Sequence, residues 1–260
     1  MKMRKTALLA AVLAAVIGLV LAACGNSKEK GTKDFFDGMT AALDSVNKVK
    51  VREYRKMLED EGGVEKYRNL IANLANNSKK TLSNSWGIKD SGSLTETANW
   101  LMEEGHNKEA LELLKASGGL DAADHSAFEA RLKGQNLDKE TCICLLAAYD
   151  AWRAYGDGAI AAWDLSRVGT IMGFGYAAGY CTYEEAMDKT LEAAKKAQEL
   201  YDSWDDFNTS YLYGYSYWAE EALDEPGSSA AERAELLDSM KAKSDGPFSV
   251  DWDIELKREW

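Results

Sequence analysis

Proline is nearly absent from this sequence of 260 residues, and histidine is equally rare. The prolines are Pro226 and Pro247, and the histidines are His106 and His125. Long proline-free stretches rich in Ala, Leu, Glu and Lys favour helices. Two histidines without a His-x-x-x-His spacing do not provide the ligands of a typical zinc site. The sequence therefore predicts an all-α protein with at most a short extended C-terminal segment, and it indicates neither a metal nor another cofactor.

Recognised catalytic and nucleotide-binding motifs are also missing. There is no Gly-x-Ser-x-Gly or Walker pattern, and the glycines from Gly173 to Gly179 have the wrong spacing for a dinucleotide loop. The segment from Asp251 to Glu255 begins like a calcium loop, but Leu256 stands where that loop needs glycine. The net charge of −12 argues against nucleic acid as a partner. No enzyme class is predicted from these patterns.

The amino terminus has the pattern of a bacterial lipoprotein signal. Three basic residues precede an uncharged run of 17 residues at positions 7–23. A spanning helix needs about 20 apolar residues, so this run is typical of a signal peptide, although a plain membrane anchor is the alternative. The run ends in a lipobox, Leu21-Ala22-Ala23-Cys24. We expect residues 1–23 to be removed and Cys24 to carry the lipid.

The residues after Cys24 are typical of a tether. Positions 24–33 are polar and lack hydrophobic periodicity, which favours a flexible segment. A diacylglycerol on Cys24 would supply two acyl chains, enough for stable anchoring. We therefore expect an exported protein held on the outer face of a bacterial membrane, with an envelope protein or a glycan as its partner.

The three other cysteines are Cys142, Cys144 and Cys181. An odd number does not make a disulfide framework, and residues two apart on a helix point away from each other. We expect buried free thiols, with one bond from either Cys142 or Cys144 to Cys181 as the alternative.

Hydrophobic periodicity divides the rest of the chain into two parts. Residues 34–80 are expected to form an N-terminal helical hairpin, and residues 81–260 a helical domain. Capping boxes are expected at Ser93 and Thr182, and Gly105 is expected to end a helix. Apolar residues alternate with acidic ones from position 251 to 256, which predicts the extended segment near the end.

Two similar hexapeptides place charged pairs in the most apolar helices. The pairs are Asp150 with Arg153 and Asp164 with Arg167, and an i,i+3 spacing puts both members on one face. If Gly156-Asp157-Gly158 turns the chain into an antiparallel hairpin, both carboxylates lie at one level. We favour an internal, self-neutralised network. The alternative is an acid–base pair in an envelope hydrolase acting on a glycan or a small polar substrate.

An aromatic stripe follows near the C-terminus. Its members fall on one helix face, and we expect it to be core, with Gly214 allowing a close helix approach. With Trp163 it would alternatively form an aromatic surface that stacks on sugars. The stripe consists of Trp204, Phe207, Tyr211, Gly214 and Trp218. His106, after Gly105, is expected to bond free helix carbonyls.

With these residues in view, the chain from about Leu82 to its end resembles domain-of-unknown-function family 1266, a bacterial family. The residues that carry the resemblance are Trp86-Gly87-Ile88, Trp100-Leu101, Glu104-Gly105-His106, Ala162-Trp163-Asp164-Leu165-Ser166-Arg167, Gly179-Tyr180, Glu184-Glu185-Ala186, Trp204 with Phe207, and Tyr211 with Gly214 and Trp218. The resemblance implies a shared helical domain and marks Trp163, Asp164 and Arg167 as a candidate centre, but it brings no activity. We expect a non-catalytic binding module.

Overall fold

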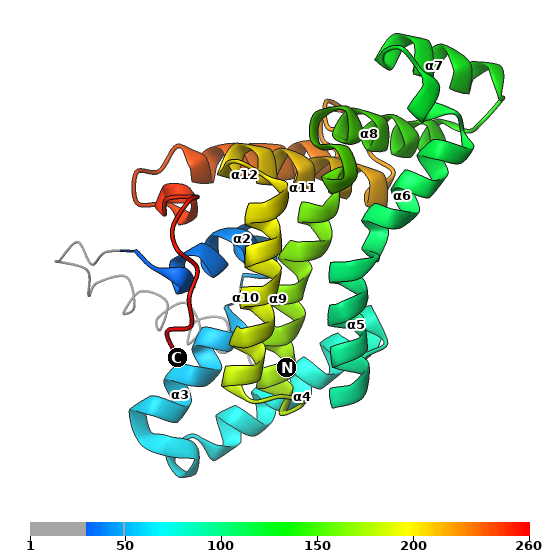
Figure 1. Cartoon of the computed structure of the whole chain (residues 1–260). Helices are drawn as coiled ribbons and strands as arrows, with labels where there is room; N and C mark the ends of the chain where they lie inside the picture. The colour runs from blue at the N-terminus through cyan, green and yellow to red at the C-terminus, as the bar shows by residue number, and fades with distance from the viewer. Residues whose placement is uncertain (1–29, 49) are drawn as a thin grey trace. The chain divides into compact units, whose positions relative to one another are not determined.

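The computed structural model describes residues 30–48 and 50–260, and every regular element in them is helical. The all-α prediction is confirmed for this part of the chain (Figure 1). The predicted signal peptide, Cys24 and most of the tether lie outside the described residues. The elements are α2 (Thr32–Asn47), α3 (Val51–Lys66), α4 (Arg68–Trp86), α5 (Ser91–Glu103), α6 (Gly105–Ala116), η1 (Gly119–Asp121), α7 (His125–Gly134), α8 (Lys139–Tyr155), η2 (Gly156–Gly158), α9 (Ala161–Ala178), α10 (Tyr183–Leu200), α11 (Trp204–Ala219), α12 (Ser229–Lys241) and η3 (Pro247–Ser249).

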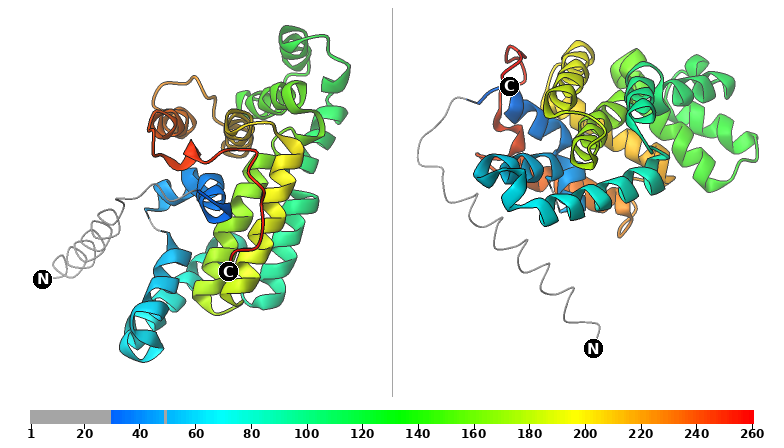
Figure 2. Two further views of the ribbon diagram at one scale, coloured as in Figure 1. Left: turned by 60° about the vertical axis from the view of Figure 1, so that its left-hand side comes forward. Right: turned by 90° about the horizontal axis from the view of Figure 1, so that it is seen from below.

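Helix α9 lies at the centre of the core. Nearly all its side chains are buried, because α2, α3, α4, α5, α10 and α11 pack around it. Figures 1 and 2 show α10 running beside it. Small residues allow these close contacts: a Cβ on Gly169 would come within 2.8 Å of Thr40 Cγ2, and one on Gly175 within 2.3 Å of Leu94 Cδ2. A helix apolar on every face is buried on every face.

Helix α8 departs from the expected hairpin. It packs against α11, α6 and α7 instead of lying along α9. The turn between α8 and α9 is the cause, since Gly156 has φ +56° and the 3-10 turn η2 redirects the chain. The apolar side chains of α8 are buried in two smaller clusters, for example Ala148 with Ile160 and Tyr149 with Phe128.

The described residues before position 81 lie in three helices. These are α2, α3 and most of α4, and α2 ends at Asn47 while α3 begins at Val51. Phe35 and Phe36 of α2 share one hydrophobic cluster with Val168 of α9. Residues 34–80 therefore belong to the same compact unit, Gly31–Trp260, as the rest of the described chain.

Capping explains most helix ends, with one correction. Thr182 and Glu185 form the expected capping box of α10. Helix α5, however, is capped by Asp90, whose side chain accepts a hydrogen bond from Ser93 N, so Ser93 is an N3 residue and not the cap. Asp is as good an N-cap as Ser, and here α5 begins directly after Asp90.

The extended C-terminal segment is not confirmed: a turn at Trp252 and Asp253 interrupts it, the residues after it have no regular secondary structure, and it pairs with no strand in the described residues. The alternation of apolar and acidic residues nevertheless predicted burial correctly at two positions, because Trp252 and Leu256 are buried. Trp252 Nε1 donates to the carbonyl of Tyr201 at 2.9 Å, and the amide of Gln198 donates to Ile254 O at 3.1 Å. Bonds to α10 and its C-terminus thus take the place of a β-ladder.

The three cysteines in the described residues are free and half-buried. Burial raises the pKa of Cys144 to about 11 and that of Cys181 to about 12. The prediction of free thiols is confirmed. Cys144 and Cys181 are weak nucleophiles, because their raised pKa values leave little thiolate at neutral pH. None of the helices within residues 30–48 and 50–260 is long and apolar enough to cross a membrane.

Close packing of α11 on α9 gives a testable prediction. A Cβ on Gly214 would lie 2.3 Å from Trp163 Cβ, so Gly214→Ala should destabilise the protein by about 1–3 kcal/mol in urea denaturation. The control is Gly134→Ala in α7, where nothing lies within 4 Å of the added atom and stability should hold or rise slightly. Equal effects of the two changes would contradict the packing argument.

Candidate functional site

A cavity of about 790 Å³ opens beside α9 and receives side chains from α2, α4, α5, α6, α11 and α12. We call it the α9 pocket. Its aromatic walls come from tryptophans on four helices, together with Phe174 and Tyr215. Its polar side chains include two arginines, and Glu96 is the only acidic residue in the lining. The residues on which the argument below depends are Trp86, Trp100, His106, Trp163, Arg167, Trp218 and Arg233.

Arg167 is held in this pocket by aromatic rings. Its guanidinium carbon lies 3.4 Å from the ring centre of Trp163, 5.3 Å from that of Trp86 and 5.4 Å from that of Trp218. The side chain is 7% exposed, and burial lowers its pKa to about 10, so it remains charged at neutral pH. Within the described residues no carboxylate forms an ion pair with it. Cation–π contacts with these rings and the negative charge of Asp164, which raises the pKa of Arg167, together stabilise this buried cation.

Arg233 brings a second guanidinium from α12. Its Nη1 donates to the hydroxyl of Tyr211 at 2.6 Å, and its guanidinium carbon lies 4.1 Å from the ring centre of Tyr215. Its Nε is buried and has no acceptor, and no carboxylate among the described residues pairs with it. Burial is the main cause of the lowered pKa of Arg167; the charge of Asp164 opposes this effect, and the charge of Arg233 adds a smaller lowering. The two cations therefore repel each other across the pocket.

Asp164 faces the start of α6. It is 1% exposed, and its carboxylate accepts hydrogen bonds from His106 Nδ1 at 2.7 Å and from the backbone N–H of Asn107 at 2.9 Å. Gly105 permits this approach, because a Cβ there would lie 2.3 Å from Asp164 Oδ2 and the residue has φ +57°. Since Nδ1 donates to the carboxylate, the other ring nitrogen of His106 is available in the pocket lining.

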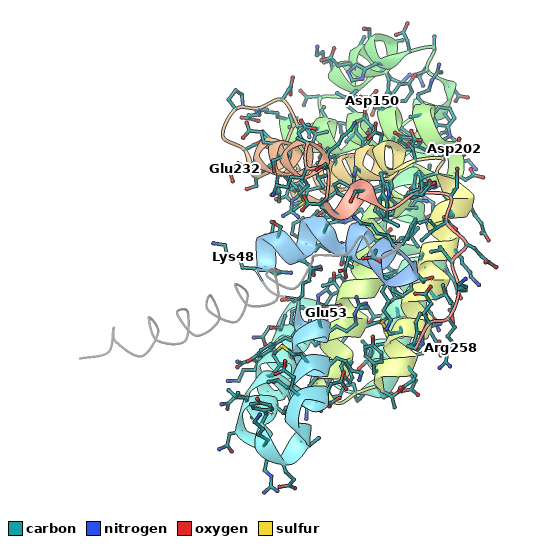
Figure 3. All side chains as sticks on the ribbon, turned by 90° about the vertical axis from the view of Figure 1, so that its left-hand side faces the viewer. Lys48, Glu53, Asp150, Asp202, Glu232 and Arg258 are labelled. Atoms are coloured by element: carbon teal, nitrogen blue, oxygen red, sulfur yellow. The ribbon has the colours of Figure 1, made fainter. Side chains whose placement is uncertain are left out.

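The other predicted pair lies elsewhere. Asp150, labelled on α8 in Figure 3, contacts His125 Nδ1 at 2.8 Å, and Arg153 donates to Ala123 O at 3.4 Å. Neither expected Asp–Arg ion pair forms within the described residues. Each aspartate binds a histidine from another helix, because tertiary packing offers a better-placed donor than the arginine three residues on. The structure therefore gives Asp150 and Asp164 no shared partner.

The aromatic stripe divides between core and pocket. Trp204, Phe207 and Tyr211 are buried, which confirms the core prediction for them, and Gly214 lies against Trp163. Trp218 differs, since 54% of it is exposed and it lines the pocket. His106 also departs from expectation, because it bonds Asp164 and not a helix carbonyl.

Sequence reasoning missed three lining residues as site members. Trp86 and Trp100 stand in the segments that carry the family resemblance, and that signal could have marked them. Arg233 gave no sequence signal, because its role depends on where α12 packs. Within the described residues no cluster of three His, Cys, Asp or Glu side chains could hold a metal ion.

These features define a class of protein, an all-α domain with a cationic and aromatic pocket beside a buried central helix. Residues 81–252 match the family described as "Protein of unknown function (DUF1266)", and the chain belongs to this family. Most of the pocket lies inside the match; only its α2 side chains precede it.

Two relatives come from Escherichia coli strain K12. The "Uncharacterized protein YbeR" is 24% identical over 137 residues, and the "Uncharacterized protein YbeU" is 25% identical over 142 residues. Each alignment covers 53% of this chain and 56% of the relative, so the chain spans about half the length of these proteins. No solved structure matches the chain.

The two Asp–His pairs allow a matched stability test. Asp164→Ala leaves the buried donors of His106 and Asn107 without an acceptor, so unfolding free energy should fall by about 3 kcal/mol or more. Asp150→Ala removes a half-exposed pair and should cost less than about 1 kcal/mol. Urea denaturation at pH 7 measures both, and a loss of similar size in the two variants would refute the structural role of Asp164.

Proposed function

We propose that this domain is a non-catalytic binding module whose α9 pocket takes a small anionic ligand. One observation carries the proposal: Arg167 and Arg233 share a cavity, and neither has a carboxylate partner within the described residues. The chain has 43 acidic and 31 basic residues, so acidic partners are abundant. Arg167 is buried and Arg233 is half-buried, and leaving two like charges without a carboxylate at such positions has a free-energy cost. An anion between them would offset that cost.

The surroundings of Arg167 support this proposal. Indole rings lie 3.4 Å and 5.4 Å from its guanidinium carbon, and because these rings are poor hydrogen-bond acceptors, the N–H groups of the guanidinium keep their capacity to donate. Such groups bind the two oxygens of a carboxylate or a phosphate in a bidentate manner. The pocket therefore favours an oxyanion over a halide, and carboxylate and phosphate share the chemistry it recognises.

The hydrolase alternative lacks comparable support. It requires Asp150 and Asp164 to act on one substrate, yet their carboxylates bond different histidines on different helices. Only Asp164, through His106, is connected to the pocket lining. Binding without catalysis is the function that this geometry supports best.

A titration of the full chain with inorganic phosphate and with acetate tests the proposal. Tryptophan fluorescence should report saturable binding, because four tryptophans line the pocket. Arg167→Gln and Arg233→Gln should each weaken it about tenfold or more, as expected when a charge-assisted hydrogen bond is lost. Arg153→Gln, an arginine outside the pocket lining, is the matched control and should bind as the parent does. Absence of saturable binding, or equal weakening by the control, would reject the proposal.

We also propose that the chain is a lipoprotein, exported and anchored through Cys24 to the outer face of a bacterial membrane. The support is the sequence pattern of residues 1–24, a basic start followed by an apolar run and a lipobox. In that setting the ligand would belong to an envelope component, a protein or a glycan that carries an anionic group.

Lipid labelling in a bacterial host tests the anchor. Cys24→Ala removes the thiol that accepts the lipid, so the protein should incorporate no labelled palmitate and should accumulate as the uncleaved precursor. Cys181→Ala is the control, since this thiol is half-buried and lies in the folded domain, and the variant should be labelled and cleaved normally. Labelling that persists in Cys24→Ala would contradict the proposal.

A further inference from the structure

Exposed apolar side chains gather at the α9 pocket. Among the large hydrophobic residues exposed in the described chain, Trp218, Val46 and Trp100 are 54%, 48% and 39% exposed, and all three line this cavity. They come from α11, α2 and α5, so separate helices place apolar surface at one site. An exposed apolar cluster with polar neighbours marks a binding surface.

The position of Trp218 relates this apolar surface to the charges. Its ring centre lies 5.7 Å from that of Trp163 and 5.4 Å from the guanidinium carbon of Arg167. The ring is thus packed on the side of these two residues, while more than half of the side chain is open to solvent. A group attached directly to an anion held by Arg167 would therefore lie beside the open part of this indole.

The size of the pocket exceeds that of a simple anion. At about 790 Å³ it falls within the roughly 300–1,000 Å³ of sites that enclose small organic molecules. Acetate or phosphate would occupy a small part of it and would leave the indole of Trp218 exposed. A flat unsaturated ring would cover that surface and would gain the offset or edge-on contacts that aromatic pairs prefer.

We infer that the ligand is an aromatic anion, a carboxylate or phosphate carried on a flat unsaturated ring, with its oxygens on Arg167 and Arg233 and its ring against Trp218. This inference rests on the proposed anion-binding function and names the ligand class. The two parts of the pocket then recognise different parts of the ligand: the arginines bind its charged group, and Trp218 contacts its ring.

Calorimetric titration of the full chain with phenyl phosphate and with methyl phosphate tests the inference, because the two monoesters differ in the group that meets Trp218. Phenyl phosphate should bind about tenfold tighter than methyl phosphate, as expected for one aromatic stacking contact. Benzoate against acetate repeats the comparison with a carboxylate. Arg167→Gln should weaken both members of each pair.

Variants of Trp218 test whether the ring of the ligand lies against this side chain. Trp218→Ala should remove most of the preference for phenyl phosphate over methyl phosphate, since stacking contributes only to the aromatic ligand. Loss of the contact between Trp218 and Arg167 affects both esters alike, so the ratio of the two affinities is the quantity measured. Trp218→Phe, which keeps a ring, should retain the preference. Leu113→Ala is the control, because Leu113 is 46% exposed but lies outside the pocket lining.

The outcomes separate the two proposals. Equal binding of phenyl and methyl phosphate, weakened in both cases by Arg167→Gln, would overturn the aromatic ligand and leave the anion-binding function standing. A preference for phenyl phosphate that survives in Trp218→Ala would also overturn the inference. Binding that ignores Arg167 and Arg233, or no binding of any of these anions, would overturn both.

Discussion

Because α9 is buried along nearly its whole length, neighbouring helices must stabilise every charged side chain it carries. An unpaired carboxylate in such a place would lose its hydration without compensation, which costs several kcal/mol. Asp164 avoids this cost through His106 and the N–H of Asn107, both at the first turn of α6. That requirement fixes where α6 begins, makes glycine necessary at position 105, and places the imidazole of His106 in the pocket lining.

Arg167, one turn further along α9, meets the same constraint differently. Indole rings lie close to its guanidinium carbon, and they stabilise the charge but are poor acceptors for its N–H groups. Its positive charge is therefore partly compensated, and its donor capacity remains available. In a buried setting such a donor interacts with an oxyanion more strongly than it would in water. If the proposed anion binds, its oxygens would recover the free energy that the incomplete pairing of Arg167 costs.

Local sequence rules predicted the helices better than they predicted the site. The capping box of Thr182 with Glu185 follows from spacing alone, because such caps involve residues three apart. The partners of Asp164 lie 57 and 58 residues earlier in the chain, so an i,i+3 rule could not find them. The burial of Trp252 was predictable from alternation, but its bond to Tyr201 depends on how the tail crosses α10. Arg233 reaches the pocket only because α12 packs on α11, a tertiary fact with no local signal.

The pocket is cationic, whereas the chain as a whole is acidic, and this difference in charge affects which anions the pocket can select. A net charge of −12 repels anions that approach within about a Debye length, about 8–10 Å at physiological salt, and the repulsion grows with the charge of the ligand. The two arginines act at contact distance, where salt screens their charges least, above all that of the buried Arg167. Highly charged anions therefore meet the stronger repulsion and can pair with only two arginines. A singly or doubly charged ligand is repelled less as it approaches. An organic anion of low charge recovers further free energy from the aromatic wall, so the acidic chain and the apolar lining favour the same kind of ligand.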